Sequence, residues 1–257
     1  MEFSKLFDLT GKVAIVTGGA NGIGQATAIL LAKAGADIAI GDFTLEDAEK
    51  TAKEIEQLGV KAIAVSCNVL KDEDLVNLVE TTVKKLEGIH ILINNAGGGG
   101  GGRENPFKIS VEDIKRDFEL NVFSGWRLCQ LCVPHMKNAG YGSIVFTTSM
   151  SSINKSPNMS GYAGSKASVN HIAANLAHDF GPEVRINCVA PGATRTAALE
   201  SVLTPEIEKQ MLANTPIKRL GTADDIAGAM LYFAAPISRW VSGQTIFVNG
   251  GGVQTLE

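Results

Sequence analysis

No apolar run in the sequence reaches the roughly 18 uninterrupted residues that a membrane-spanning helix requires. The segment from Met1 to Thr10 also lacks a positively charged start followed by an apolar core, so we expect no secretion signal. Basic residues are outnumbered, with 23 Lys and Arg against 27 Asp and Glu, and this balance argues against nucleic-acid binding. These absences predict a cytoplasmic protein that binds neither membrane nor nucleic acid.

Cysteine is scarce as well, although two of the four cysteines have a spacing found in metal and redox sites. Cys129 and Cys132 form a C-x-x-C pair. A zinc site would need a second pair or nearby histidines, and a thioredoxin-type motif would begin a helix directly after a strand. This pair lies instead inside an apolar segment with helical periodicity. We therefore interpret both cysteines as buried apolar side chains and expect no metal site.

What the sequence does contain is a regular alternation of short β-branched runs with longer helical patterns. The nearly continuous apolar character of the runs suits parallel strands that are covered on both faces. No Pro- or Ser-rich linker divides the chain, so residues 1–257 are predicted to form a single α/β domain. The predicted strands are Lys12–Thr17, Asp37–Asp42, Lys61–Cys67, Ile89–Asn94, Gly142–Thr148, Arg185–Ala190 and Gln244–Val248.

Two of the helical patterns begin with a capping-box pair, a Ser or Thr followed three residues later by an acid. We therefore predict a helix over residues 44–58 and a longer helix over residues 110–135. The pairs are Thr44 with Asp47, and Ser110 with Asp113.

A glycine cluster, T-G-G-A-N-G-I-G, follows the first predicted strand and leads directly into a helical pattern. Gly18, Gly22 and Gly24 let the backbone turn tightly and approach a pyrophosphate at the helix N-terminus, where free N–H groups favour an anion. The spacing differs from G-x-G-x-x-G, and glycines alone are weak evidence. Their position after the first strand nevertheless indicates a Rossmann-like, doubly wound parallel seven-stranded sheet with helices on both faces.

Asp42 ends the second predicted strand, and 42 − 24 = 18 residues separate it from the last glycine of the cluster. This is close to the spacing of the acid that binds the adenosine ribose in dinucleotide sites. Its carboxylate would accept a hydrogen bond from the ribose 2′-hydroxyl and would repel the 2′-phosphate of NADP. The next residues, Phe43 to Leu45, offer no cation, so we predict NAD as the cofactor. The alternative is a solvated turn acid.

Tyr162 and Lys166 are four residues apart in a helical pattern over residues 161–180 and would lie on one helix face. Such a pair is usually structural. Here Ser149 follows the fifth predicted strand, at the sheet edge where ligands bind in open α/β folds. We expect the ammonium to lower the pKa of Tyr162 from its ordinary value of about 10, so that the phenol can exchange a proton with a substrate near neutral pH.

In order and position, these motifs resemble the short-chain dehydrogenase/reductase family from about Gly11 to the C-terminus. That family interconverts secondary alcohols and ketones with a nicotinamide cofactor and no metal. The resemblance implies that Tyr162 is the acid/base, Ser149 binds the substrate oxygen and Lys166 holds the nicotinamide ribose. The matching segments are Thr17–Gly24, Asn94–Gly97, Asn121, Ser149 with Tyr162 and Lys166, and Pro191-Gly192 with Thr196.

The same resemblance implies that Asn121 positions a proton-relay water, and it extends the predicted cofactor site. Two residues depart from the family pattern, because Asn68 and Asn249 stand where aspartates are usual. An amide oxygen at Asn68 could still accept from adenine. The predicted cofactor-binding residues are Gly18, Asn21, Gly22, Ile23, Gly24, Asp42, Asn68, Val69, Asn95, Tyr162, Lys166, Pro191, Gly192, Thr194 and Thr196.

Stretches around the predicted site are similar to bacterial hydroxysteroid dehydrogenases that act on bile acids. They suggest a hydroxysteroid substrate, with the 7α-hydroxyl favoured and the 12α and 3α positions kept open. The stretches are the glycine run Gly97–Gly102, Thr148–Met150, Asn154-Lys155, Asn158-Met159, Thr204–Glu208 and Gly250–Gln254. The glycine run follows a predicted strand and would border the site, although such a run can also be a mere flexible loop.

A steroid needs an apolar trough, and the segment from Ala193 to Ile217 supplies apolar residues at helix-like spacing. We expect a substrate lid there, while packing of the same residues on the core is an equal alternative. They are Ala197, Ala198, Leu199, Val202, Leu203, Ile207, Met211 and Leu212.

Two other functions and the oligomeric state complete the predictions. A 3-oxoacyl-carrier-protein reductase would share the fold and site residues, but Asp42 argues against the NADPH that such enzymes prefer. A catalytically inactive Rossmann binding protein is the non-enzyme alternative, and the intact Ser149, Tyr162 and Lys166 argue against it. The family resemblance of the helices over residues 110–135 and 161–180 implies a homotetramer.

Overall fold

The computed structural model of the chain describes residues 2–99 and 104–252. In this part of the chain, seven parallel strands form one sheet in the order β3-β2-β1-β4-β5-β6-β7. The order reverses between β1 and β4, so the sheet is doubly wound as predicted, and every predicted strand overlaps an observed one. The strands are β1 (Val13–Thr17), β2 (Asp37–Asp42), β3 (Ala62–Ser66), β4 (Ile91–Asn94), β5 (Gly142–Thr147), β6 (Val184–Pro191) and β7 (Thr245–Val248).

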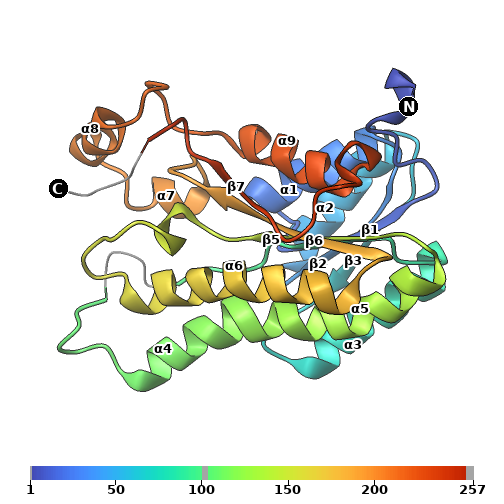
Figure 1. Cartoon of the computed structure of the whole chain (residues 1–257), viewed down its shortest axis with the longest axis horizontal. Helices are drawn as coiled ribbons and strands as arrows, with labels where there is room; N and C mark the ends of the chain where they lie inside the picture. Colours follow the sequence, from blue (N-terminus) through green and yellow to red (C-terminus); the bar gives the residue numbers. More distant parts are fainter. Residues whose placement is uncertain (1, 100–103, 253–257) are drawn as a thin grey trace.

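Helices cover both faces of this sheet (Figure 1). One face carries α1 (Gly22–Lys33), α2 (Leu45–Glu56) and α9 (Ala223–Ala234), and the other carries α3 (Asp72–Leu86), α4 (Val111–Phe118), α5 (Ser124–Asn138) and α6 (Ser160–Phe180). Two short helices, α7 (Ala197–Glu200) and α8 (Pro205–Ala213), lie beyond the sheet, at the same end as the N-termini of α4 and α6. Within the described ranges, no helix is both long and apolar enough to cross a membrane.

Each face of the sheet has its own apolar core. Ile15 of β1 packs in the core under α5, together with Leu128 of that helix. The next strand residue, Val16, packs in the opposite core with Leu31 of α1. Because both faces are covered, almost every strand position is apolar, and this is why the strands could be read from the sequence.

The long helix predicted over residues 110–135 is present but not uniform. The capping box is confirmed, since Ser110 Oγ accepts from the Asp113 N–H at 3.0 Å. Between α4 and α5 the backbone forms a π-helical segment, Glu119–Phe123, which contains Asn121. Such widened turns occur mostly as single-turn insertions, often at functional sites. One inserted residue leaves no visible signature in the apolar periodicity, so the sequence could not predict it.

The start of α2 was predicted at the right residue but with the wrong contact. Thr44 is the N-cap, yet its side chain makes no capping hydrogen bond. The Thr44 N–H donates to Asp42 Oδ1 at 3.0 Å instead. Asp42, at the end of β2, therefore bonds the backbone at the start of α2, and Asp47 does not complete a capping box with Thr44.

The C-x-x-C pair is structural in this fold. Cys129 and Cys132 are free thiols, fully buried in α5. Burial raises the pKa of Cys132 to about 12 and holds that of Cys129 well above its ordinary value. Thiols that stay protonated at physiological pH are poor nucleophiles. Among the residues described, no group of three or more His, Cys, Asp or Glu side chains could hold a metal ion.

Candidate active site

A cleft of about 400 Å³ opens where β1, β4, β5 and β6 end. Parallel strands present their ligand-binding edge at their carboxyl ends, so this is the expected place for a site. The cleft also receives Thr147, which the sequence did not single out, together with Ala96 of the segment Asn94–Gly97 and Ala197 of the predicted lid. Of the predicted site residues it contains Gly18, Asn21, Gly22, Ile23, Asp42, Asn95, Ser149, Tyr162, Lys166, Pro191, Gly192, Thr194 and Thr196.

The glycine turn between β1 and α1 has no room for side chains. Gly18 and Gly22 adopt positive φ angles of 63° and 56°. A Cβ at Gly24 would lie 2.0 Å from Gly18 O and 2.6 Å from Asn95 Nδ2. The N-cap of α1, Asn21, makes no side-chain capping bond, so it does not occupy the first N–H groups of the helix. A bare, tightly folded helix N-terminus at a cleft fits the pyrophosphate of a dinucleotide.

Asn95 holds the strand ends beneath the cleft together. Its Nδ2 donates to Thr17 O and Gly18 O, both at 3.1 Å, and its Oδ1 accepts from Thr147 Oγ1 at 3.1 Å. Thr17 Oγ1 in turn accepts from the N–H groups of Asn95 and Ala96. The side-chain amide of Asn95 thus links the ends of β1, β4 and β5. Predicted to bind cofactor, it lines the cleft with its polar atoms already bonded within the protein.

Asp42 lies at the cleft and fixes the glycine turn. One carboxylate oxygen accepts from the Ala20 N–H at 3.0 Å and the other from the Thr44 N–H at 3.0 Å. Phe43 beside it is exposed. Among the described residues that line the cleft, Lys166 is the sole cation, and it lies one helical turn from Tyr162. Within this described lining, no other cation could offset a phosphate added beside Asp42.

Three predicted cofactor residues do not line the cleft: Gly24, which is buried within the glycine turn, and Asn68 and Val69, which follow β3. Asn68 Oδ1 accepts from the Leu70 N–H at 3.1 Å, and the Asn68 N–H donates to Asp74 Oδ2 at 2.8 Å. These two hydrogen bonds join Asn68 to its own loop after β3 and to the first turn of α3. Val69 is buried and, like Asn68, does not line the cleft. Their contact with adenine remains a prediction.

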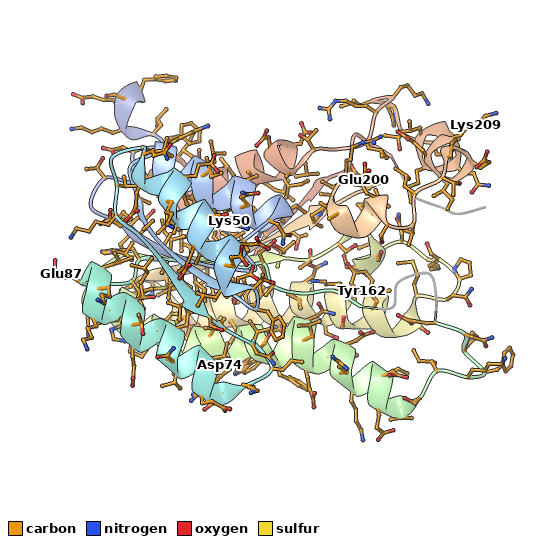
Figure 2. The ribbon with its side chains drawn as sticks, turned by 180° about the vertical axis from the view of Figure 1, so that it is seen from behind. Lys50, Asp74, Glu87, Tyr162, Glu200 and Lys209 are labelled. Carbon is orange, nitrogen blue, oxygen red and sulfur yellow. The ribbon has the colours of Figure 1, made fainter. Side chains whose placement is uncertain are left out.

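Ser149, Tyr162 and Lys166 converge at the inner end of the cleft, with Tyr162 in the first turns of α6 (Figure 2). The Tyr162 hydroxyl is hydrogen-bonded to the Ser149 side chain. One turn further along α6, the buried Lys166 Nζ donates to Thr147 O at 2.8 Å and lies 5.9 Å from the Tyr162 ring centre. The three residues therefore line one part of the cleft, where Ser149 bonds Tyr162 and Lys166 lies beside its ring.

The electrostatics of this group differ from the sequence prediction. Burial raises the pKa of Tyr162, the hydrogen bond from Ser149 counteracts that rise, and the negative charge of Asp117 adds to it. Burial also lowers the pKa of Lys166 to about 8. The predicted lowering of the Tyr162 pKa by Lys166 is not found, because the ammonium is directed at Thr147 O and burial of the phenol dominates.

Asn121 lies behind the cleft and not on its surface. Its Nδ2 donates to Gly98 O at 2.7 Å and to Ser165 Oγ at 3.0 Å, and its Oδ1 accepts from the Gly98 N–H at 3.0 Å. The Ser165 hydroxyl donates to Tyr162 O at 2.7 Å. Asn121 therefore ties the glycine loop after β4 to α6. Its predicted role in positioning a relay water remains a prediction.

The glycine run reaches the site as expected in the part that the structure describes. Gly97 and Gly98 line the cleft, and a Cβ at Gly99 would lie 2.8 Å from Tyr162 Cδ2. Glycine is needed at such contacts because any side chain would displace the Tyr162 ring. Gly100, Gly101 and Gly102 lie outside the described residues, as do Val253 and Gln254 of the C-terminal stretch.

The segment predicted to form the lid, residues 193–217, is largely exposed. No residue of α8 is buried, and Leu199, Leu203 and Ile207 stay partly exposed. The two short helices are joined by Arg195, which forms ion pairs with Glu200 at 2.9 Å and Glu208 at 2.8 Å. The short helices α7 and α8 lie at the same end of the molecule as the N-terminal part of α6, which carries Tyr162 (Figures 1 and 2).

Part of the predicted lid does face the body of the protein. Met211 and Leu212 line a small cavity of about 120 Å³ that is closed on its other sides by residues such as Ile217 and Asn249. Asn249 is itself used structurally, since its Nδ2 donates to Gly252 O at 2.6 Å. The role of residues 193–217 as a substrate lid remains a prediction.

This fold and this cleft define a short-chain dehydrogenase/reductase. The sequence profile of the family described as enoyl-(acyl carrier protein) reductase matches residues 18–252. The chain belongs to the short-chain dehydrogenase/reductase family and is an oxidoreductase.

One relative is the 7α-hydroxysteroid dehydrogenase of Escherichia coli strain K12, which is 47% identical over 250 residues, covering 97% of each chain. A solved structure of 7α-hydroxysteroid dehydrogenase, complexed with NADH and 7-oxo glycochenodeoxycholic acid, is 46% identical and covers 100% of both chains with a TM-score of 0.96. A 3-oxoacyl-[acyl-carrier-protein] reductase of Thermotoga maritima is 33% identical over 244 residues, 95% of this chain and 98% of the relative.

Proposed function

We propose that this chain is an NAD-dependent hydroxysteroid dehydrogenase that interconverts the 7α-hydroxyl of a bile acid and the 7-ketone. The observation that carries the proposal is the likeness, over the whole chain, to an enzyme solved with NADH and a 7-oxo bile acid. The cleft supports it, because Ser149, Tyr162 and Lys166 line the same cleft as the dinucleotide turn and Ala197 of α7.

The residues of the cleft fit a nicotinamide dinucleotide. The turn at Gly18, Gly22 and Gly24 would hold the pyrophosphate, and Asp42 would accept from the adenosine ribose. Lys166 would donate to the nicotinamide ribose, while Pro191, Gly192, Thr194 and Thr196 border the opposite wall. When bound, the cofactor supplies the hydride acceptor for alcohol oxidation and the hydride donor for ketone reduction.

The protein's own part in the reaction is proton transfer and positioning. In oxidation, Tyr162 would take the proton from the substrate hydroxyl, and in reduction it would return one to the carbonyl oxygen. Ser149, bonded to the same phenol, would hold the substrate oxygen beside it. The buried Lys166 keeps a positive charge next to the site.

A substrate panel tests the proposed function. We expect measurable oxidation of bile acids that carry a 7α-hydroxyl with NAD, and much slower oxidation of those with only a 3α- or 12α-hydroxyl. A preference for the 12α- or 3α-hydroxyl would still support a hydroxysteroid dehydrogenase, but one that acts at a different position of the steroid. Turnover of 3-oxoacyl thioesters with NADPH, without activity on any bile acid, would contradict the proposal and favour the acyl-carrier-protein reductase alternative.

The choice of NAD depends on Asp42, so we predict that Asp42→Asn narrows the preference for NAD over NADP by about tenfold or more, because a charge repulsion of roughly 1–2 kcal/mol is removed. Asn can keep an oxygen acceptor toward the glycine turn, whereas Asp42→Ala loses it and should also weaken NAD binding. The ratio of kcat/KM for the two cofactors measures the effect. A wild-type enzyme that prefers NADP would contradict the prediction.

Cofactor affinity should depend on pH through Lys166. Because burial lowers its pKa to about 8, Lys166 is charged below this pH and neutral above it. We predict that the Kd for NADH rises as the pH increases through about 8, since the neutral amine attracts the negatively charged dinucleotide less. Fluorescence titration on both sides of pH 8 measures it. A Lys166→Met variant should bind more weakly and without this pH dependence.

We include in the proposal a cytoplasmic homotetramer with a substrate lid over residues 193–217. Large apolar side chains are exposed along α4, the π-helical segment and α5, namely Val111, Phe123 and Trp126. Exposed apolar surface of this kind is typical of subunit interfaces. Light scattering that gives a monomer at working concentration would contradict the assembly.

A further inference from the structure

The N-cap residue of α6, the helix that carries Tyr162, provides no capping side chain. The first N–H groups of a helix need partners from outside the helix, and the N-cap side chain usually supplies one. At the start of α6 the N-cap is Met159, which makes no side-chain capping bond. Gly161 and Tyr162, at the second and third positions of the helix, therefore depend on an acceptor from elsewhere in the chain.

Glu104, 58 residues before Tyr162, supplies that acceptor. Its two carboxylate oxygens accept from the Gly161 N–H at 2.7 Å and from the Tyr162 N–H at 2.9 Å. Its own N–H donates to Asn158 O at 3.1 Å, just before the helix. The side chain is buried, with 3% exposed. A buried carboxylate bonded to two amides at a helix N-terminus is held by charge-assisted hydrogen bonds and the helix dipole.

A second carboxyl group faces the same turn from α4. A Cβ at Gly161 would lie 3.2 Å from Asp117 Oδ2 and 3.3 Å from Glu104 Oε2. Burial, followed by the charges of Glu104 and Asp113, raises the pKa of Asp117. The first turn of α6 is thus enclosed by two acids, of which Glu104 makes the hydrogen bonds.

The other contacts of Tyr162 leave few alternatives for its position. Gly99 approaches its ring, Ser165 Oγ donates to its carbonyl oxygen, and Ser149 bonds its hydroxyl. These contacts act on the ring, on the carbonyl and on the hydroxyl. Among the described residues, only Glu104 accepts a hydrogen bond from the Tyr162 N–H. Glu104 therefore fixes the position of the first turn of α6 relative to the rest of the protein.

We propose that Glu104 is a positioning residue for the reaction, whose carboxylate holds the first turn of α6 so that the Tyr162 hydroxyl meets Ser149. The inference rests on the acid/base role proposed for Tyr162. Neither a motif nor a capping pattern in the sequence points to Glu104, which follows the glycine run in a loop. Its position becomes visible only when the loop is folded against α6.

Replacement of Glu104 tests the proposal against an ordinary loss of a helix cap. In Glu104→Ala we expect kcat to fall about tenfold or more while the KM for NAD stays within about twofold, because a displaced acid/base affects the chemical step and not uniform binding. Glu104→Gln keeps one oxygen acceptor and should regain part of the loss. If the Ala variant does not fold, the Gln variant is compared with the wild type.

The matched control is Thr222→Ala. Thr222 Oγ1 accepts from the Asp225 N–H at 3.3 Å at the start of α9, a helix that carries no proposed site residue. This variant should lose stability and keep its kcat. A loss of kcat below about fivefold in Glu104→Ala, or an equal loss in the control, would overturn the proposal.

An experiment without turnover separates this inference from the proposed function. Hydrogen exchange of the segment over residues 160–166 should be faster in Glu104→Ala than in wild type and unchanged in Thr222→Ala. Unchanged exchange in Glu104→Ala would overturn the inference whatever the substrate is. If no bile acid is oxidised, the proposed function fails, and the exchange result still decides whether Glu104 holds the first turn of α6.

Discussion

Tyr162→Phe is expected to lower kcat by a factor of about 10² to 10⁴, the range for losing a general acid/base, with little change in cofactor affinity. The substitution removes one hydroxyl from a phenol that is bonded to Ser149 and leaves the ring packed against Gly99. Substrate then has no group that can take or return a proton at the inner end of the cleft. Steady-state kinetics with a 7α-hydroxy bile acid, and NADH titration, measure the two effects.

Tyr141→Phe is the matched control for this experiment. The Tyr141 hydroxyl donates to Ala234 O at 2.6 Å, far along the sheet from the cleft. Its loss should lower the free energy of unfolding by about 1 kcal/mol, the usual contribution of such a hydrogen bond, and leave kcat unchanged. If Tyr162→Phe kept more than about a tenth of the wild-type kcat, Tyr162 would not be the acid/base.

Gly24→Ala is expected to weaken cofactor binding by about 100-fold or more, because the added methyl group would overlap atoms of the glycine turn. The new Cβ would lie 2.0 Å from Gly18 O and 2.6 Å from Asn95 Nδ2. Both neighbours are held, since Asn95 links three strand ends. Relief of the overlap must move the glycine turn, and misplacement of binding groups by about 1 Å can cost 10²-fold. Titration with NADH measures the loss.

The control for Gly24→Ala is another helical glycine. Gly228 of α9 is exposed, and a Cβ there would meet nothing within 4 Å. Gly228→Ala should therefore stabilise the protein by about 0.5–1 kcal/mol, by reducing backbone entropy in the unfolded chain, and should leave NADH binding unchanged. Thermal unfolding of both variants separates a local steric effect from the general cost of replacing glycine. Normal NADH affinity in Gly24→Ala would contradict the close turn.

The sequence predicted the sheet well because burial on both faces makes each strand visible as an apolar run. It also located Ser149, Tyr162 and Lys166, since their chemistry and spacing are local properties of the chain. It did not reveal the contacts that hold them. Asn95, expected at the cofactor, uses its amide between strand ends, and Glu104 reaches α6 from a loop without any local pattern. Such contacts depend on how distant segments meet, which periodicity does not encode.

The sequence also did not predict the direction in which the pKa of Tyr162 is shifted. Spacing placed Lys166 on the same helix face as Tyr162, and from this a lowered phenol pKa was expected. The balance is set by burial and by Asp117 from another helix, and the charge of Lys166 is directed at Thr147 O. The loop after β3 gave a similar result, because Asn68 bonds its own loop. A pKa is a property of the folded surroundings and not of the spacing between two residues.

The double attachment of Asp42 limits how the cofactor preference could be re-engineered or could drift in evolution. The carboxylate proposed to exclude the NADP phosphate is the same one that binds the N–H groups of Ala20 and Thr44. A substitution that removes the oxygen acceptors together with the charge therefore also releases the glycine turn from β2. A switch to NADP would need two coordinated changes: an uncharged acceptor at position 42 to retain the turn, and a cation in place of the exposed Phe43. Either change alone leaves an intermediate that serves neither cofactor well.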